Sequence, residues 1–259
     1  MKSSHFSDSR LVEFFRIILT NIGFRVQRAL VCRQLRMTKQ PPKRSPSTNS
    51  DSIGKLRVIG GSLRSRTIQF QTDPRTRPMK DRTREAMFNL LGSDMEGFVA
   101  CDLFAGSGIL AIESISRGAT AAVAIELLER ASSEIRANAT RLGVNEQLIV
   151  HRSDTFKWHQ DLPDQFRQMS LRIPAFFKDR WCVFICPPYQ LWETNLDDMK
   201  ELIEKWIDSA PVGSLFAIEL DQSTSPDVLP QWIDWQKRLY RPALIAIGEK
   251  LVASNPYIS

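Results

Sequence analysis

The segment Cys101–Glu113 (CDLFAGSGILAIE) constrains the fold of this 259-residue chain more than any other. It joins a short apolar run directly to a glycine-rich turn and then to a helical pattern. Gly106 and Gly108 lack a Cβ atom, so the backbone can approach a ligand closely, and the amides that open the helix can bind its polar groups. Close packing of a strand on a helix demands the same glycines. The strand, turn and helix context favours ligand binding.

Strand patterns and helix patterns alternate after this segment. Five apolar runs are typical of strands, at 99–104, 121–126, 147–151, 182–186 and 214–220. Helical patterns lie at 109–116, 128–142 and 196–209, and a final strand pair is expected at 235–240 and 243–250. Because such alternation implies parallel strands covered by helices, the chain is predicted to form an α/β, Rossmann-like sheet of seven strands with helices on both faces.

A smaller unit is expected before this sheet. Residues 56–70 (LRVIGGSLRSRTIQF) predict two short strands joined by a turn at Gly60 and Gly61, and a helix follows at 81–91. We therefore divide the chain into an extension at 1–55, a hairpin and helix module at 56–96, and a main domain at 97–252.

The extension carries the positive charge of the chain. Residues 1–52 hold ten Lys and Arg against three Asp and Glu, whereas the other 207 residues hold 25 against 26. The apolar run at 11–19 is too short and too charged for a membrane span, and it matches a signal peptide poorly. We expect a disordered or partly helical segment. The alternatives are a basic amphipathic helix on a membrane or RNA surface, and a start of translation at Met37.

The four cysteines and three histidines are scattered and show no metal-ligand spacing. We expect a reduced, cytoplasmic protein, monomeric, without a metal site and without stable membrane association.

Acidic residues follow or end the first three predicted strands. Asp102 closes the first strand and is suited to accept a bond from an amine or to orient the glycine turn. Glu126 ends the next strand, 20 positions after Gly106, where a carboxylate can accept both hydroxyls of a ribose; the alternative is a solvated acid. Asp154 suits an adenine amine or the cap of a helix. These residues predict a ligand that carries an adenosine, either a nicotinamide cofactor or S-adenosylmethionine.

The fourth strand runs into Cys186–Pro187–Pro188–Tyr189. Two prolines stiffen the turn and remove two N–H donors, which leaves carbonyl acceptors beside an aromatic ring. Such a turn suits a flat base that carries an amino group, with Tyr189 stacked on the base. A nicotinamide enzyme has no task for it, so the fourth strand favours S-adenosylmethionine.

These residues resemble a known family, the bacterial small-subunit ribosomal RNA guanine-N2 methyltransferases, over roughly residues 56–250. The matching segments are RVIGGSLRSR, TRPMKDRTREAMFNLL, DLFAGSGILAIESISRGA, the strand that ends in Ile125–Glu126, and the Pro-Pro-Tyr turn. The second segment is the most specific to the family. The resemblance implies a class I methyltransferase that transfers a methyl group from S-adenosylmethionine to the N2 amine of a guanine.

The resemblance also implies roles for individual residues. The residues expected to hold S-adenosylmethionine are Asp102, Phe104, Gly106, Gly108, Glu126 and Asp154. The resemblance assigns Arg77, Arg82 and Arg84 to a lid over the cofactor or to the RNA surface. Independently of the resemblance, the basic residues clustered in this part of the sequence, with Arg57, Arg64 and Arg66 in the hairpin, are expected to contact RNA phosphates; the alternative is a solvated face with helix-terminal ion pairs. The expected partner is small-subunit rRNA, or an assembling 30S particle, that presents an unstacked guanine.

One position departs from the family pattern, because related enzymes have Asp or Asn where this chain has Cys186. A thiol is a weak hydrogen-bond acceptor. Three interpretations stay open: the Pro187 carbonyl and positioning suffice for transfer, the chain is a catalytically weakened RNA-binding protein, or Cys186 is a nucleophile. The third is disfavoured because the cysteine precedes both prolines. Methylation of another base or of DNA is a further alternative.

Overall fold

The computed structural model describes residues 53–72 and 79–252 of the chain. The predictions made for residues 1–52 and for Arg77 lie outside these described residues.

Seven strands form one sheet in the order β5-β4-β3-β6-β7-β9-β8. Their bounds are β3 Phe98–Asp102, β4 Ala121–Glu126, β5 Leu148–Arg152, β6 Arg180–Ile185, β7 Leu215–Asp221, β8 Trp235–Tyr240 and β9 Ala243–Glu249. Strands β3 to β7 are parallel to one another, and β9 pairs antiparallel with both β7 and β8. The predicted seven-stranded α/β sheet with a terminal hairpin is confirmed.

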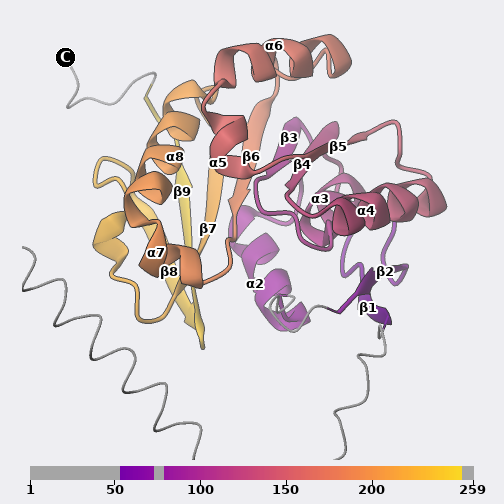
Figure 1. Ribbon diagram of the computed structural model, residues 1–259, viewed down its shortest axis with the longest axis horizontal. Helices are drawn as coiled ribbons and strands as arrows, with labels where there is room; N and C mark the ends of the chain where they lie inside the picture. Colours follow the sequence, from indigo (N-terminus) through magenta and orange to yellow (C-terminus); the bar gives the residue numbers. More distant parts are fainter. Residues whose placement is uncertain (1–52, 73–78, 253–259) are drawn as a thin grey trace, which may run out of the picture. The chain divides into compact units, whose positions relative to one another are not determined.

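Helices cover both faces of this sheet (Figure 1). One face carries α2 Asp81–Leu91, α3 Ile109–Ser116 and α4 Glu129–Leu142; the other carries α5 Thr155–His159, α6 Leu162–Arg172, α7 Gln190–Thr194 and α8 Leu196–Ser209, with a 3-10 turn at Pro226–Val228. Successive strand side chains point to opposite faces, so Ala100 packs with α2–α4 while Val99 and Cys101 pack with α5–α8. Strands buried on both faces are apolar throughout, which is why the strand signal is clear.

Helices α5 and α6 follow β5 in the chain and precede β6; the sequence analysis offered a helix start at Asp154, where α5 begins, and did not predict α6. Phe166 of α6 packs against Trp181 of β6 and Trp206 of α8, with ring centroids 5.0 and 5.3 Å apart. Both tryptophans are fully buried. Large aromatic side chains remove much apolar area from water, so this cluster holds α6 on the sheet.

The predicted N-terminal strands form a separate two-stranded antiparallel sheet, β1 Ile53–Arg57 and β2 Thr67–Gln71. The connection between them, residues 58–66, docks on the last turn of α3, where the Ser62 amide donates to the Ser116 carbonyl at 2.6 Å. A Cβ atom on Gly61, whose φ is +74°, would lie 1.7 Å from that oxygen. Only glycine fits this approach.

A buried ion cluster joins the hairpin, α2 and α3. The Arg84 guanidinium donates to Glu113 at 2.9 Å and to the Arg57 carbonyl at 2.6 Å. Glu113 also accepts from the Gly60 amide at 3.2 Å and from Arg117 at 2.9 Å. The side chains of Arg84 and Glu113 are fully buried, so each charge depends on the other for its stability in the core.

Candidate active site

The five parallel strands end at one edge of the sheet, which we call the carboxyl edge; the opposite edge is the amino edge. β3 lies between β4 and β6, and Asp102 pairs with Ala124 on one side and Phe184 on the other. The glycine turn after β3, Glu126 and Cys186 therefore meet at the carboxyl edge. Ligands of open α/β sheets bind at this edge, which makes it the candidate site.

Asp102 lies fully buried at the end of β3. No described side chain donates a hydrogen bond to its carboxylate oxygens, and the backbone amides of Phe104 and Ala111 lower the pKa of the carboxyl. Burial raises the pKa of this carboxyl to about 7, and the neighbouring Glu126 carboxylate acts in the same direction. A cationic ligand group would add donors to those two amides and favour the charged form.

The two glycines of the turn have different surroundings. A Cβ atom on Gly106 would meet no atom within 4 Å, whereas one on Gly108 would lie 2.8 Å from the Ile135 side chain of α4. Gly106 is exposed and Gly108 is buried. Helix packing therefore accounts for Gly108, while Gly106 leaves open space at the strand end that a ligand can fill.

Glu126 is held by two backbone amides, from Gly106 and from Leu128, each at 2.8 Å. Burial raises the pKa of its carboxyl. Leu127 and Leu128 follow it with 59% and 42% of their surface exposed. Two exposed leucines beside a buried carboxylate offer an apolar wall to a ligand; the sequence analysis did not single them out.

Asp154 and Phe104 complete the predicted cofactor set. Asp154 caps α5, because its side chain accepts the Phe156 amide at 2.9 Å. Phe104 is half-buried and meets the edge of the Phe156 ring at 6.1 Å between centroids. The cap accounts for one oxygen of Asp154, and a ligand role for both residues stays a prediction.

The Cys186–Tyr189 turn follows β6 directly. Pro187 is buried, Pro188 is exposed, and Cys186 and Tyr189 are half-buried. The Pro188 carbonyl accepts the Leu191 amide at 2.9 Å and the Tyr189 carbonyl accepts the Trp192 amide at 3.0 Å, which begins α7. The expectation that carbonyls of this turn point outward as acceptors is therefore wrong for these two residues.

The thiol of Cys186 is not activated for nucleophilic attack. Burial raises its pKa well above the ordinary value, and the Glu219 and Asp102 carboxylates raise it further. Reactive cysteines have the opposite surroundings, with positive charge nearby. The environment of Cys186 thus argues against the nucleophile interpretation.

Glu219 is a site residue that the sequence analysis missed. It lies within β7, half-buried, and accepts the Tyr189 hydroxyl at 2.7 Å. Burial raises the pKa of its carboxyl, and the hydrogen bond from Tyr189 opposes that rise. Its one signal in the sequence is an acid inside an apolar strand pattern, in LFAIELD.

The predicted RNA-contacting arginines fall into separate groups. Arg57, Arg64, Arg66 and Arg82 are exposed. Arg84 is fully buried against Glu113, so its prediction as a surface contact is wrong: it holds the hairpin in place instead.

Two of the exposed arginines lie away from the candidate site. Leu63 donates to the Ser116 hydroxyl at the end of α3, and α3 runs from the glycine turn back to the amino edge. Arg64 and Arg66, next in the chain, therefore lie toward the amino edge.

Arg82 has the opposite placement. Arg84 meets Glu113 midway along α3, and Arg117 at the end of α3 donates to the Ser93 carbonyl that follows α2. The start of α2, with Lys80 and Arg82, therefore points to the carboxyl edge. The turn between β8 and β9 adds the exposed Arg241 to this edge, because Ala243 pairs with Asp221 at the end of β7.

Comparison with known proteins assigns the chain. Residues 56–247 match the family described as Conserved hypothetical protein 95. The chain belongs to this family. Methylase RP545 of Rickettsia prowazekii, an uncharacterized protein, is 36% identical, covering 67% of this chain and 88% of its own length. Ribosomal RNA small subunit methyltransferase D of Buchnera aphidicola (strain APS) is 27% identical over 187 residues, covering 71% of this chain and 88% of its own length.

Solved structures support the fold of this family member. The yhhF protein of Escherichia coli has a TM-score of 0.60 at 22% identity, over 78% of this chain and 100% of that one. TrmN from Thermus thermophilus has a TM-score of 0.51 at 20% identity, over 65% of this chain and 48% of that one. The structural neighbours have the class I methyltransferase fold, as predicted.

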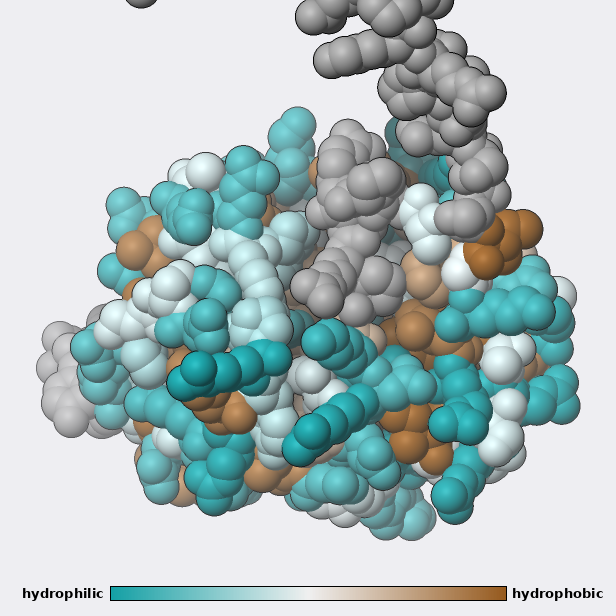
Figure 2. Space-filling model, turned by 90° about the horizontal axis from the view of Figure 1, so that it is seen from below, coloured by the Kyte–Doolittle hydropathy of each residue, from teal (hydrophilic) through white to brown (hydrophobic). Residues whose placement is uncertain are grey.

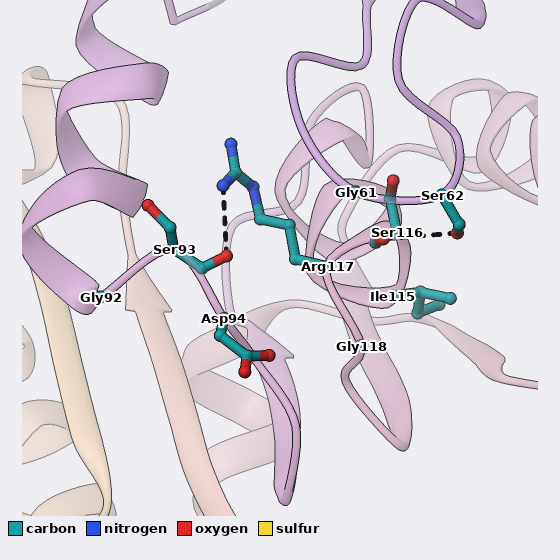
Figure 3. A pocket seen from close by; sticks show the side chains of 9 residues that line it. All are labelled: Gly61, Ser62, Gly92, Ser93, Asp94, Ile115, Ser116, Arg117 and Gly118. Atoms are coloured by element: carbon teal, nitrogen blue, oxygen red, sulfur yellow. Dashed lines mark hydrogen bonds between the residues drawn. The ribbon is translucent and has the colours of Figure 1, made fainter.

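A surface hollow lies at the amino edge, away from the candidate site. It is lined by Gly61, Ser62, Gly92, Ser93, Asp94, Ile115, Ser116, Arg117 and Gly118. Arg117 spans it to reach the Ser93 carbonyl at 3.2 Å (Figure 3). These contacts join the hairpin connection, α2 and α3, so the hollow marks their junction and not the end of a parallel strand.

Within residues 53–72 and 79–252 no group of three or more metal-ligating side chains is placed to hold a metal ion. In the same residues no helix has the length and apolar character needed to cross a membrane.

Proposed function

We propose that this chain transfers a methyl group from S-adenosylmethionine to the N2 amine of a guanine in small-subunit rRNA. The observation that supports the proposal is the position of β3 between β4 and β6, which brings the carboxyl ends of β3 and β4 and the Pro-Pro-Tyr turn to one edge. The rRNA methyltransferase name of the Buchnera relative supports the substrate class.

The residues at the carboxyl edge fit this cofactor. Asp102 has two buried oxygens to which no described side chain donates, which suits an ammonium group, and Glu126 suits ribose hydroxyls. The open space at Gly106 lets the ligand approach the protein backbone closely, and Leu127 and Leu128 offer apolar contact to an adenine. When bound, S-adenosylmethionine supplies an electrophilic methyl group that needs no metal.

The Pro-Pro-Tyr turn would receive the base. Tyr189 is half-buried, with its hydroxyl fixed by Glu219, so its ring is held in one orientation. Stacking of a base on such a ring contributes about 1–3 kcal/mol. The base must leave its own stack to reach the turn, which favours a guanine in a loop or exposed in an assembling particle.

The RNA backbone would contact the basic residues at the same edge, Lys80, Arg82 and Arg241. Figure 2 views the molecule from the side on which α7, α2 and β1 lie in Figure 1, and hydrophilic residues cover most of that face. Phosphate contacts position a nucleic acid, while the pocket selects the base. A monomeric, cytoplasmic protein with a hairpin module at 56–96 and a main domain at 97–252 stays our prediction.

The deciding experiment incubates the full chain with labelled S-adenosylmethionine and small ribosomal subunits from cells that lack the modification. We expect label in one guanosine, identified as the N2-methyl form by nucleoside mass spectrometry. Label in another base would support the methyltransferase activity and reject guanine as the target base. Calorimetry with S-adenosylhomocysteine and with NAD accompanies it; tighter binding of NAD would reject the cofactor.

One alternative has an observation in its favour. Cys186 places a weak acceptor beside the pocket, which is compatible with a catalytically weakened RNA-binding protein of the same fold. That protein would bind the ribosomal subunit and S-adenosylhomocysteine but incorporate no label.

A further inference from the structure

Glu219 and Cys186 lie side by side at the carboxyl edge. β6 and β7 are parallel, and their last registered pair is Ile185 with Ile218. Cys186 and Glu219 come next on each strand. In a parallel pair, residues in register point to the same face of the sheet, so the Glu219 carboxylate lies beside the turn that follows Cys186.

Two hydrogen bonds fix Glu219 to this turn. The Tyr189 hydroxyl donates to Oε1 at 2.7 Å, and the Trp192 indole donates to the Glu219 carbonyl at 3.1 Å. No described residue donates to the second carboxylate oxygen, Oε2. No described Lys, Arg or His forms an ion pair with Glu219. A half-buried carboxylate without a cationic partner is costly to keep, and such groups gather at functional sites.

The turn itself offers few acceptors to an amine. The Cys186 thiol is a weak acceptor, and the Pro188 and Tyr189 carbonyls already accept amides of α7, which leaves the neutral Pro187 carbonyl as the backbone acceptor that the sequence analysis named. An exocyclic amine that enters the pocket brings two N–H donors. The carboxylate of Glu219 is the strong acceptor that stands beside it.

We propose that Glu219 accepts a hydrogen bond from the target amine through Oε2 while its Oε1 holds the ring of Tyr189 against the base. This inference rests on the proposed function. The nitrogen lone pair forms the new N–C bond as the carbon–sulfur bond breaks, and that bond's electron pair stays on sulfur. The nitrogen then releases one proton, which Glu219 accepts and passes to water. Glu219 is therefore assigned both an acceptor role and a positioning role.

Three variants separate the two roles. Glu219→Gln removes the second acceptor but can still accept the Tyr189 hydroxyl, and we expect kcat to fall about 100-fold or more. Tyr189→Phe removes only the hydrogen bond to Oε1 and keeps the ring, so kcat should fall less than about 10-fold. Glu219→Asp keeps a carboxylate and should retain more activity than Glu219→Gln.

The readouts besides kcat are the KM for the ribosomal subunit, the affinity for S-adenosylhomocysteine and the unfolding temperature. We expect all three to stay close to wild type in Glu219→Gln, because the loss is confined to the reacting amine. Glu249→Gln is the matched control, since Glu249 is an exposed acid on β9 that pairs with Leu215 at the other end of the same sheet.

The outcomes are distinguishable. If the wild-type chain transfers methyl groups and Glu219→Gln is equally active, or falls no further than Tyr189→Phe, the acceptor role is overturned and the proposed function stands. If the wild-type chain transfers no methyl group to any base, both proposals fall together. If Glu219→Gln does not fold, Glu219→Asp decides: activity below that of Tyr189→Phe supports the acceptor role, and activity equal to wild type overturns it.

Discussion

The backbone amide of Gly106 donates to the carboxylate of Glu126 at 2.8 Å. This bond ties the glycine turn after β3 to the end of β4. The other Glu126 oxygen accepts the Leu128 amide at 2.8 Å, so one carboxylate organises both segments that line the proposed adenosine site. Each oxygen keeps a further lone pair for a ligand hydroxyl.

Glu126→Gln is expected to weaken S-adenosylhomocysteine binding at least about 10-fold, a loss of about 1.4 kcal/mol. The substituted amide turns its NH2 group toward one of the two backbone N–H groups, so donor faces donor and the turn loses its anchor. Calorimetry measures the affinity. Glu129→Gln is the control, because Glu129 is an exposed acid three positions later that pairs with Arg152; equal losses in both variants would contradict a specific role for Glu126.

The two glycines of the turn should respond differently to alanine. Gly106→Ala meets no atom but has a φ of +52°, so the free energy of unfolding should fall by only about 1–2 kcal/mol while ligand affinity is lost. Gly108→Ala adds overlap with Ile135, which costs about 1–3 kcal/mol more. Denaturant unfolding and calorimetry separate these effects. Gly143→Ala, at a φ of +74° in open space after α4, supplies the strain without the site and should leave affinity unchanged.

Asp102→Asn should stabilise the free protein at high pH and abolish ligand binding. The pKa of Asp102 is raised from 3.8 to about 7 by burial and by Glu126, so the folded state favours the protonated acid. Its contribution to stability is complete below pH 4 and is lost as the pH rises through about 7. Unfolding at pH 8 should require roughly 2–4 kcal/mol more in the variant than in wild type.

The same titration governs the ligand. If the ionised carboxylate pairs with an ammonium group, the affinity of wild type for S-adenosylhomocysteine should rise with pH up to about 7 and then level off. The variant should lack this dependence. A flat pH profile in wild type would show that Asp102 does not titrate against the ligand.

Cys186→Ser should keep methyl transfer within about a factor of five of wild type. The thiol is held protonated by burial and by two neighbouring carboxylates, so it is a poor nucleophile, and a hydroxyl of similar size preserves the pocket. Initial rates on ribosomal subunits test this. Loss of more than 100-fold, with S-adenosylhomocysteine affinity unchanged, would restore the nucleophile interpretation.

Arg82→Ala should weaken binding to small-subunit rRNA and lower the slope of log affinity against log salt by about one, as expected for one phosphate contact. Arg66→Ala is the matched comparison, because Arg66 is also exposed but lies toward the amino edge. Filter binding at several salt concentrations measures both. A larger effect for Arg66 than for Arg82 would place the RNA on the opposite edge.

The sheet was predictable because its signals are local. Strands buried on both faces are continuous apolar runs, and Asp102 and Glu126 stand at strand ends that the pattern itself marks. Helix α6 escaped prediction because its stability comes from Phe166 packing on Trp181 and Trp206, a contact between distant segments. Glu219 was missed for a similar reason. An acid near the carboxyl end of a strand can be recognised as a site residue only from its contact with Tyr189, which lies in the turn after the neighbouring strand β6.

Arg84 shows how a charge in a basic segment can mislead. It stands among exposed basic residues, and its residue type does not distinguish it from Arg82. Its partner Glu113 lies 29 residues away on α3. The period of α2 places Arg84 on the inward face with Met87 and Phe88, and that periodicity is the signal that identifies it as buried.

The cluster of Arg84 and Glu113 also couples the unfolding of the hairpin to the unfolding of the sheet domain. Removing one member of a buried ion pair costs about 3–5 kcal/mol, and Glu113 collects donors from the hairpin connection, from α2 and from its own helix. If the hairpin and α2 separated from the sheet, Glu113 would lose these donors, so we expect the hairpin and the sheet to unfold together. A fragment that starts at residue 97 would expose both the Glu113 carboxylate and the apolar face of α3. We therefore expect that residue 96 divides the chain in sequence only, and that the parts on either side of it do not fold independently.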